Sequence, residues 1–253
     1  LGGSHIQAHE SGAVDNEVES EAEAFEHIRR FLSYLSSSVW EPPPLIRSND
    51  GPDRREASLI SIVPRDRRTV YDMRSILALV LDIDSFFEIG GGFGRSLITG
   101  LARLDGVPIG VMANDPSVFA GAIDRNAAEK MTRFTDLCDT FYLPVVNFVD
   151  NPGFLVGKEA EMQGTIRAGV RALAAVYQAT TPWCSIIVRK AFGVAGAGHS
   201  NHTRTSTRYA WPSAEWGSLP IEGGVEAAYK RQIAASDDPD KLRADLEENL
   251  ASL

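Results

Sequence analysis

The first hydrophobic pattern along the chain is a helical stripe in residues 15–35. Apolar side chains recur there at every third or fourth position, and the opposite face is acidic: Val18, Ala22, Phe25, Ile28, Leu32 and Leu35. This spacing brings them onto one side of an α-helix, so we expect an amphipathic helix over residues 15–35. Residues 36–56 are instead rich in Ser, Pro, Asn, Asp and Gly, which predicts a linker without helix or central strand.

Beyond the linker, the pattern predicts a helix from Asp72 to about Leu81 and a short strand over residues 86–89. Two apolar runs, residues 97–104 and 107–112, are separated only by Asp105-Gly106. A pair of this kind favours the positive φ angles of a two-residue hairpin turn, so we expect a β-hairpin here.

Helical and strand patterns alternate in the next part of the chain. We expect helices at about 121–141 and 159–179, and strands at 145–149 and 185–189. Both strands are almost continuously apolar, as is typical of parallel strands covered by helices on both faces. The sequence therefore indicates an α/β fold.

Composition and charge exclude several classes of protein. The chain has 253 residues with a net charge of −9, which excludes a binder of nucleic-acid polyanions. No apolar stretch approaches the roughly 20 residues of a membrane span. The N-terminus has no initiator Met and no signal-peptide pattern, so we expect a piece of a longer protein. The only cysteines, Cys138 and Cys184, fit reduced thiols and a cytoplasmic location.

Motifs for nucleotides, metals and acyl transfer are incomplete. Gly90–Gly94 lacks the last glycine of a dinucleotide fingerprint, where Arg95 stands, and is better explained as a flexible turn. Gly153–Lys158 is one residue short of a P-loop. His199 and His202 have no Cys, Asp or Glu nearby, so we expect a surface or capping role and no metal site. No G-x-S-x-G sequence supplies a nucleophilic serine.

Two loops follow the predicted buried strands, at the edge where open α/β sheets bind ligands. The first spans residues 150–157 and the second, rich in Gly and Ala, spans residues 190–198. Small side chains let a ligand approach the backbone, and N–H groups at a helix start stabilise negative charge. A tight strand-to-helix turn explains the same residues, and composition alone leaves both interpretations open.

Short segments in a fixed order connect the chain with a known family. They are Leu1–Gly3 with Ser11-Gly12, Phe86–Ile89, Gly100–Arg103 with Gly106, Ala120–Asp124, Arg133–Asp136, Phe148–Phe154, Arg189–Gly193, Tyr209–Pro212 and Gly223–Ala228. Together they resemble the C-terminal half of the carboxyltransferase (beta) subunit of biotin-dependent acyl-CoA carboxylases, of the propionyl-CoA and acetyl-CoA carboxylase type.

The resemblance implies an α/β fold of the crotonase-like (ClpP/crotonase superfamily) ββα type, preceded by a helical connecting segment. Residues 1–56 would be the end of the upstream carboxyltransferase domain, the connecting helix and the Pro-rich linker. Residues 57–253 would be the C-terminal carboxyltransferase domain, truncated at its C-terminus. In the family, the active site lies between the first domain of one subunit and the second domain of another, so this chain alone would be inactive.

The implied activity moves a carboxyl group from carboxybiotin to the α-carbon of propionyl-CoA or acetyl-CoA. Biotin would arrive on a carrier protein, without covalent attachment to this chain, and it would act as the base itself, which accounts for the missing acid-base residues. The implied partners are the biotin carboxylase and biotin carboxyl carrier subunits and further carboxyltransferase subunits, as a homo-oligomer built as a hexamer of dimers. Neither nucleic acid nor membrane is expected as a partner.

The resemblance also assigns site residues. The backbone N–H groups of Val194 and Ala195 would donate to the ureido oxygen of biotin. Seven further residues would bind substrate or biotin: Pro152, Gly153, Phe154, Phe192, Gly193, Gly196 and Ala197. Val194 departs from the pattern, because the family usually has Gly there and a β-branched residue restricts the backbone. Ala197, at the position that helps set acyl-chain size, suggests a roomier pocket.

Three alternatives remain open at this point. One is a biotin-dependent acyl-CoA decarboxylase subunit, and another is a catalytically incomplete assembly module. A hydratase of the crotonase type is less consistent with the sequence, because Glu159 and Glu161 lie two residues apart and face different sides of a helix.

Overall fold

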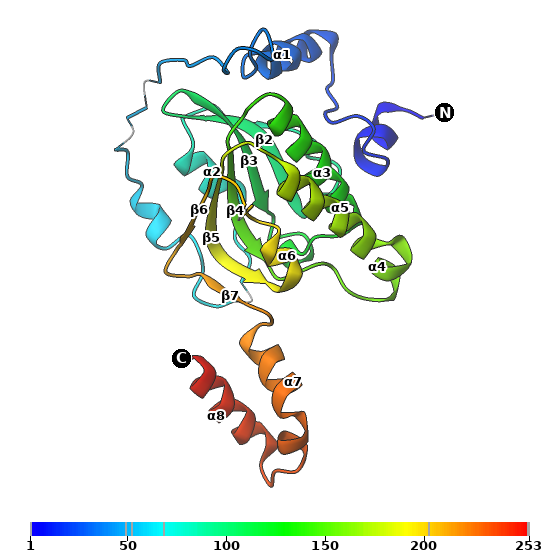
Figure 1. Cartoon of the computed structure of the whole chain (residues 1–253), viewed down its shortest axis with the longest axis vertical. Coiled ribbons are helices and arrows are strands. Elements are labelled where there is room, and N and C mark those ends of the chain that lie inside the picture. The colour runs from blue at the N-terminus through cyan, green and yellow to red at the C-terminus, as the bar shows by residue number, and fades with distance from the viewer. Residues whose placement is uncertain (1, 49, 52, 68, 202, 252–253) are drawn as a thin grey trace.

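A computed structural model describes residues 2–48, 50–51, 53–67, 69–201 and 203–251 (Figure 1). Its centre is a seven-stranded sheet with strand order β1-β2-β3-β4-β5-β6, in which β7 also pairs with β5. The strands are β1 (Phe87–Glu88), β2 (Leu97–Leu104), β3 (Val107–Asn114), β4 (Val145–Asn151), β5 (Trp183–Phe192), β6 (Ser206–Ala210) and β7 (Glu215–Gly217). Strands β1 to β3 are antiparallel, whereas β3 to β6 run parallel.

The helices surround this sheet. They are α1 (Glu21–Leu32), α2 (Met73–Val80), α3 (Arg125–Thr140), α4 (Lys158–Gln163), α5 (Thr165–Gln178), α6 (Gly193–Ala197), α7 (Ile221–Ala234) and α8 (Pro239–Ala251). Short turns of other helix types lie at Ile6–Glu10, Ala57–Ile60 and Phe119–Gly121. None of the described helices is both long enough and apolar enough to cross a membrane.

The predicted hairpin is confirmed. Strands β2 and β3 pair in antiparallel register up to Leu104 opposite Val107, and Asp105 and Gly106 both have positive φ, 50° and 77°. The carboxylate of Asp82 accepts both turn N–H groups at 2.8 Å, which satisfies two donors that the hairpin itself leaves open.

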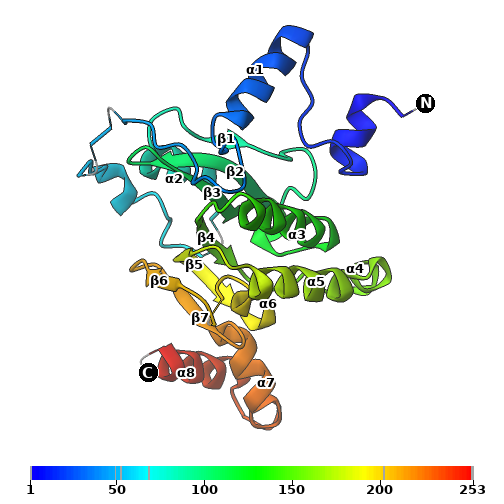
Figure 2. The same cartoon turned by 45° about the horizontal axis from the view of Figure 1, so that its top comes forward.

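Helices cover both faces of the sheet, as the apolar strands β4 and β5 predict (Figure 2). On one face, α3 packs against alternate residues of β2, such as Leu97 and Leu101, and α5 packs beside α3 in the same core cluster. On the other face, α2 packs against the intervening residues, such as Ile98 and Ala102. The expected β-α-β organisation is therefore confirmed.

Element boundaries differ from the expected ones in two helices. The helix expected at 159–179 is divided into α4 and α5 at Gly164, whose φ of 79° ends the first helix. The helix expected over 15–35 is shorter, because the Ser20 hydroxyl accepts the Glu23 N–H and starts α1 only at Glu21. The described residues of 36–56 contain neither helix nor strand, as their composition predicts.

The C-terminal part of the chain forms a separate pair of helices. Helices α7 and α8 pack against each other and project from the sheet beyond β7 (Figures 1 and 2). At the other end, α1 lies over the hairpin edge, where Arg103 donates to the carbonyls of Ser33 and Pro44. The connecting segment is therefore fixed to the sheet by the guanidinium of a buried arginine.

Candidate functional site

The two loops singled out in the sequence lie side by side. Strands β4 and β5 are parallel neighbours, with Val149 opposite Ile187 and Asn151 opposite Ala191. The loop after β4 (residues 150–157) and the loop after β5 (residues 190–198) therefore leave the same edge of the sheet. This placement confirms that both loops share the carboxyl edge.

The second loop turns directly from strand to helix. Gly193 has a φ of 64°, which residues other than glycine adopt only with strain, and α6 begins there. Val194 and Ala195 occupy the first turn, where N–H groups have no acceptor within the helix. Their side chains differ, since Val194 is 67% exposed and Ala195 only 1%.

Two glycines of this loop are closely packed, whether or not a ligand binds. A Cβ on Gly196 would lie 3.0 Å from the carbonyl carbon of Ala191 in β5. A Cβ on Gly198 would lie 2.3 Å from Leu173 Cδ2 in α5. The small residues therefore let α6 pack closely between β5 and α5, a role that composition could not separate from ligand access.

A pocket of about 230 Å³ opens beside α6. It is lined by Val149, Ser185, Ile187, Ala191, Gly193, Gly196, Ala197, His199, Arg208, Trp216 and Gly217. Three of the residues predicted to bind substrate or biotin, Gly193, Gly196 and Ala197, are among them. The other six are not among its lining residues: Pro152, Gly153, Phe154, Phe192, Val194 and Ala195.

The first loop is anchored to the core by Phe154 and its neighbours. The Phe154 ring packs against Gly169 in α5. A Cβ on Gly169 would lie only 2.5 Å from this ring. The backbone of Ile123 donates to Gly153 O at 3.0 Å and accepts from Leu155 N at 2.9 Å. These contacts give Phe154 a structural role, and its contact with a ligand stays a prediction.

The expected surface or capping role of His199 is wrong. Its side chain is buried, and its ring lies between two buried amides, with Nδ1 2.8 Å from Asn147 and Nε2 2.7 Å from Asn151. The segment after α6 packs under the edge of the sheet. The sequence around His199 has no apolar pattern, so it does not predict this burial. His202 lies outside the described residues.

Hydrogen bonding sets the tautomer of His199. Asn151 Oδ1 accepts the Gly153 N–H at 2.8 Å, so its amide NH₂ donates to His199 Nε2. The ring proton then belongs on Nδ1, where the Asn147 side-chain nitrogen lies 2.8 Å away and the Asn147 side-chain oxygen has no partner. Turning the Asn147 amide by 180° exchanges these two atoms and lets the oxygen accept the Nδ1 proton. Burial, followed by the nearby charge of Arg208, lowers the pKa of His199 to about 3, so the ring is neutral.

The capping role belongs to a neighbour of His199. The Asn201 amide donates to the carbonyls of Val176, Tyr177 and Ala179 at 3.1, 3.0 and 3.3 Å. These carbonyls end α5, where the helix leaves acceptors without partners. Asn201 thus closes α5 behind the pocket.

A buried ion pair joins the ends of β4 and β5. Arg189 donates to Asp150 Oδ2 through Nε and a terminal nitrogen, both at 3.0 Å, and the Tyr71 hydroxyl donates to the same oxygen at 2.9 Å. Asp150 is fully buried and Arg189 is 4% exposed. Since every charged atom here has a partner, we assign the pair a structural role in fixing the two loops.

Arg208 and Trp216 are among the pocket residues that sequence reasoning missed. They lie on β6 and β7, strands of five and three residues that pair with β5. Both strands are mostly exposed and lack a long apolar run. In the sequence, only the family resemblance of the Tyr209–Pro212 segment indicates that β6 and its surroundings are structured.

Comparison with known proteins gives a consistent result. The model of the carboxyl transferase domain family matches residues 1–252. The chain is 40% identical over 247 residues to the carboxyltransferase subunit of propionyl-CoA carboxylase from Haloferax mediterranei, covering 97% of this chain and 48% of that protein. It is 35% identical over 246 residues to the methylmalonyl-CoA carboxyltransferase 12S subunit of Propionibacterium freudenreichii, covering 97% and 47%. The chain thus spans about half the length of these curated relatives.

Solved structures agree with the sequence comparison. The transcarboxylase 12S hexamer, crystallised with methylmalonyl-CoA and methylmalonic acid bound, matches with a TM-score of 0.93 at 34% identity, over 98% of this chain and 48% of that chain. A single-chain, multi-domain long-chain acyl-CoA carboxylase matches with a TM-score of 0.78 at 31% identity, over 97% and 24%. The crotonase-like α/β fold expected from the sequence is confirmed.

Proposed function

Since the chain belongs to the carboxyl transferase domain family, we propose that it forms the biotin side of a carboxyltransferase site. The activity is transfer of a carboxyl group from carboxybiotin to the α-carbon of propionyl-CoA or acetyl-CoA. The names of the relatives, propionyl-CoA carboxylase and methylmalonyl-CoA carboxyltransferase subunits, support a short acyl-CoA. Because the chain spans about half of those proteins, the complete reaction needs the remaining half of the site.

The observation that carries this proposal is the pocket beside α6. Its α6 side is formed by residues without bulky side chains, Gly193, Gly196 and Ala197, whereas Arg208 and Trp216 lie among its other lining residues. His199 behind it is neutral, because its pKa is lowered to about 3. A small pocket with an uncharged histidine and two N–H groups without helix acceptors nearby fits the uncharged, oxygen-bearing ring of biotin.

In the reaction, the protein contributes backbone donors instead of side-chain acids. When bound, biotin supplies the carboxyl group and the base. The N–H groups of Val194 and Ala195 donate to the ureido oxygen and stabilise negative charge that develops there. Phe192 and Gly193 set the position of α6, while Pro152, Gly153 and Phe154 form the facing loop. Asn151 and His199 hold the two loops together.

The chain's organisation and partners belong to the same proposal. Residues 1–56 comprise the end of an upstream domain and a connecting segment, and residues 57–253 form the carboxyltransferase domain. The chain works in a homo-oligomer, a hexamer made of three dimers, with biotin carboxylase and carrier subunits and without nucleic acid or membrane. The hexamer of the transcarboxylase 12S structure supports this assembly. Two free cysteines among the described residues support a cytoplasmic location.

A second candidate uses the same pocket in the opposite direction. The alpha subunit of methylmalonyl-CoA decarboxylase from Veillonella parvula is 37% identical to this chain over 232 residues, covering 91% of this chain and 46% of that protein. Net decarboxylation in a whole complex would favour this candidate over carboxylation. The third candidate, an assembly module, predicts no turnover in any combination.

The test measures loss of the carboxyl group from methylmalonyl-CoA or malonyl-CoA on addition of free biotin, without ATP. The chain is assayed alone and together with the part of the transcarboxylase 12S subunit that it does not match. We expect biotin-dependent loss only in the combination. Val194→Pro, which removes one donor N–H, should lower it at least about tenfold. Val194→Ala keeps the N–H and should stay within about twofold.

Two outcomes oppose the proposal. Equal rates in Val194→Pro and Val194→Ala would remove the backbone donor from the mechanism. No loss with either acyl-CoA, in combinations shown to associate by gel filtration, would favour the assembly module.

A further inference from the structure

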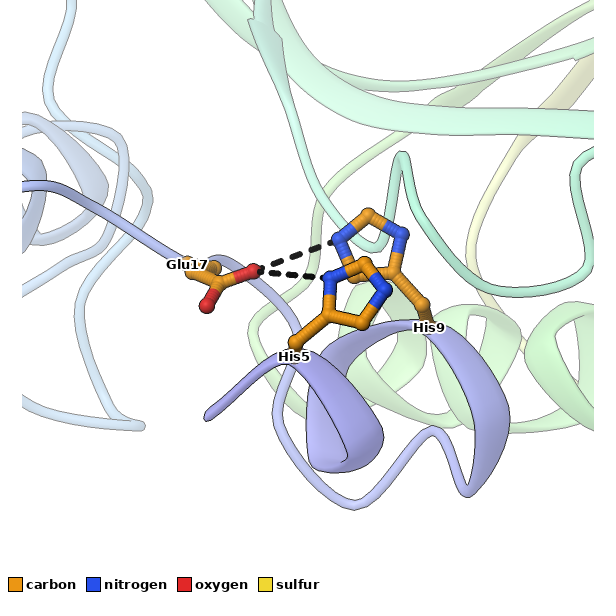
Figure 3. A group of neighbouring side chains, drawn as sticks. All are labelled: His5, His9 and Glu17. Carbon is orange, nitrogen blue, oxygen red and sulfur yellow. Dashed lines mark ion pairs between the residues drawn. The ribbon is translucent and has the colours of Figure 1, made fainter. Parts of the chain in front are cut away.

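A cluster of metal-ligating side chains lies far from the pocket along the chain, in the segment that precedes α1 (Figure 3). We propose that His5, His9 and Glu17 form a binding site for a divalent first-row transition-metal ion such as Zn²⁺. One ligand atom from each residue lies within 4.8 Å of the other two. This inference is independent of the carboxyltransferase activity.

The distances suit one ion between the three groups. Glu17 Oε2 lies 3.6 Å from His5 Nδ1 and 3.3 Å from His9 Nε2. Two ligands that each lie about 2.0–2.1 Å from a tetrahedral zinc are about 3.3 Å apart, so both distances to Glu17 are close to those of a closed site. A rotation of the exposed His5 ring would bring its nitrogen lone pair onto the same ion. The two imidazole rings are stacked, with centroids 4.3 Å apart, which puts both rings on the same side of Glu17.

The His9 ring is held by packing. His9 belongs to the helical turn Ile6–Glu10, in which Ala8 is buried, so this turn is docked against the body of the protein. A Cβ on Gly92 would lie 2.6 Å from His9 Nδ1. The Nδ1 edge of the ring therefore packs on the Gly90–Gly94 turn, and Nε2 is the atom that meets Glu17.

The position of Glu17 is also fixed from outside the cluster. Its neighbour Asn16 donates to Glu88 O at 2.9 Å and accepts from Gly90 N at 3.3 Å. Ser4 donates to the second carboxylate oxygen, Oε1, at 2.5 Å and leaves Oε2 for the histidines. Residues distant in sequence thus hold a carboxylate and two imidazoles together, and a hydrogen bond such as that from Ser4 to Glu17 orients a metal ligand.

The donor set defines the class of ion. Two imidazole nitrogens and one carboxylate suit Zn²⁺, Co²⁺, Ni²⁺ or Cu²⁺, whereas Mg²⁺ and Ca²⁺ prefer oxygen ligands. All three side chains lie at the surface, so an ion from solvent can reach them. Three protein ligands leave one tetrahedral position for water or another group.

The test uses Co²⁺ as a spectroscopic probe and the 253-residue chain made without a histidine tag. Titration should give a single site with the visible absorption of four- or five-coordinate Co²⁺, and Zn²⁺ should displace it. His5→Ala, His9→Ala and Glu17→Gln should each weaken Co²⁺ binding at least about tenfold. Mg²⁺ should not compete.

The matched control is His27→Gln, which removes an imidazole from α1 outside the cluster and should leave Co²⁺ affinity within about twofold. The exposed ligands allow the variants to fold, and circular dichroism verifies this. Co²⁺ binding that is equal in wild type, His5→Ala and His9→Ala would overturn the proposal. So would a spectrum that shows only hexa-aqua Co²⁺ at saturating protein concentration.

Discussion

The Nε2 atom of His199 lies 2.7 Å from the side-chain amide of Asn151, so a residue after α6 is hydrogen-bonded to the end of β4. Asn151 in turn accepts the Gly153 N–H at 2.8 Å. The two loops of the candidate site are therefore connected through one buried imidazole. Any change at His199 should affect both the fold and the pocket that it lines.

Replacement of His199 by Ala should lower the free energy of unfolding by about 2–4 kcal/mol, because two buried amides lose their partner and a cavity forms. Urea unfolding followed by circular dichroism measures the loss. His27→Ala, which removes an imidazole that only partly packs against Phe87, serves as the comparison and should cost less. A loss at His199 no larger than that at His27 would contradict the bridging role.

The His199 bridge should also make stability depend on pH in a defined window. The pKa of His199 is lowered from 6.5 to about 3, chiefly by burial. Below pH 6.5 the unfolded chain binds a proton that the folded chain binds only near pH 3, so falling pH favours unfolding. The stability advantage of wild type over His199→Gln should be full above pH 6.5 and shrink toward pH 3. An advantage that is constant from pH 7 to pH 4 would contradict a neutral, buried ring.

The Asp150–Arg189 pair should be far more important for stability than a surface pair. Asp150→Asn leaves the Arg189 guanidinium buried without its counter-charge and should cost about 3–5 kcal/mol in urea unfolding. Glu129→Gln, in the exposed pair with Arg125, should cost less than about 0.5 kcal/mol. Similar losses in the two variants would show that the buried pair does not fix β4 to β5.

Lys130 should stabilise the Gly90–Gly94 turn, which the sequence predicts and the structure confirms as a turn. Its buried ammonium group donates to the carbonyls of Gly90, Phe93 and Leu97 at 2.7, 2.9 and 2.7 Å. Lys130→Met leaves these acceptors without the donor and should cost about 1–3 kcal/mol. Lys158→Met, at an exposed position, should have little effect. Thermal unfolding of the two variants makes the comparison, and equal melting temperatures would exclude this role.

Local signals were sufficient for the central part of the fold. The Asp105-Gly106 turn and the apolar runs beside it predicted β2 and β3, because turn chemistry and hydrophobic pattern agree there. The continuous apolar character of β4 and β5 predicted helices on both faces. In contrast, β6 and β7 are short and mostly exposed, so only their pairing with β5 makes them strands.

The candidate site was predictable only in outline. The positions of the two loops followed from the strands before them, and Gly193, Gly196 and Ala197 line the pocket. His199 was misassigned because its partners, Asn147 and Asn151, are about 50 residues away and polar, so no local pattern marks the site as buried. A buried polar network depends on tertiary contacts that periodicity does not report.

The most direct test of the central claim is the response of the Val194 and Ala195 backbone amides to free biotin, measured by nuclear magnetic resonance on the ¹⁵N-labelled chain. If these N–H groups donate to the ureido oxygen, both amide protons should move downfield with a common saturation curve. The amide protons of Gly223 and Gly224 in α7 should not move. The proposed biotin site would be contradicted if biotin shifted amide signals elsewhere to saturation while the signals of Val194 and Ala195 stayed unchanged.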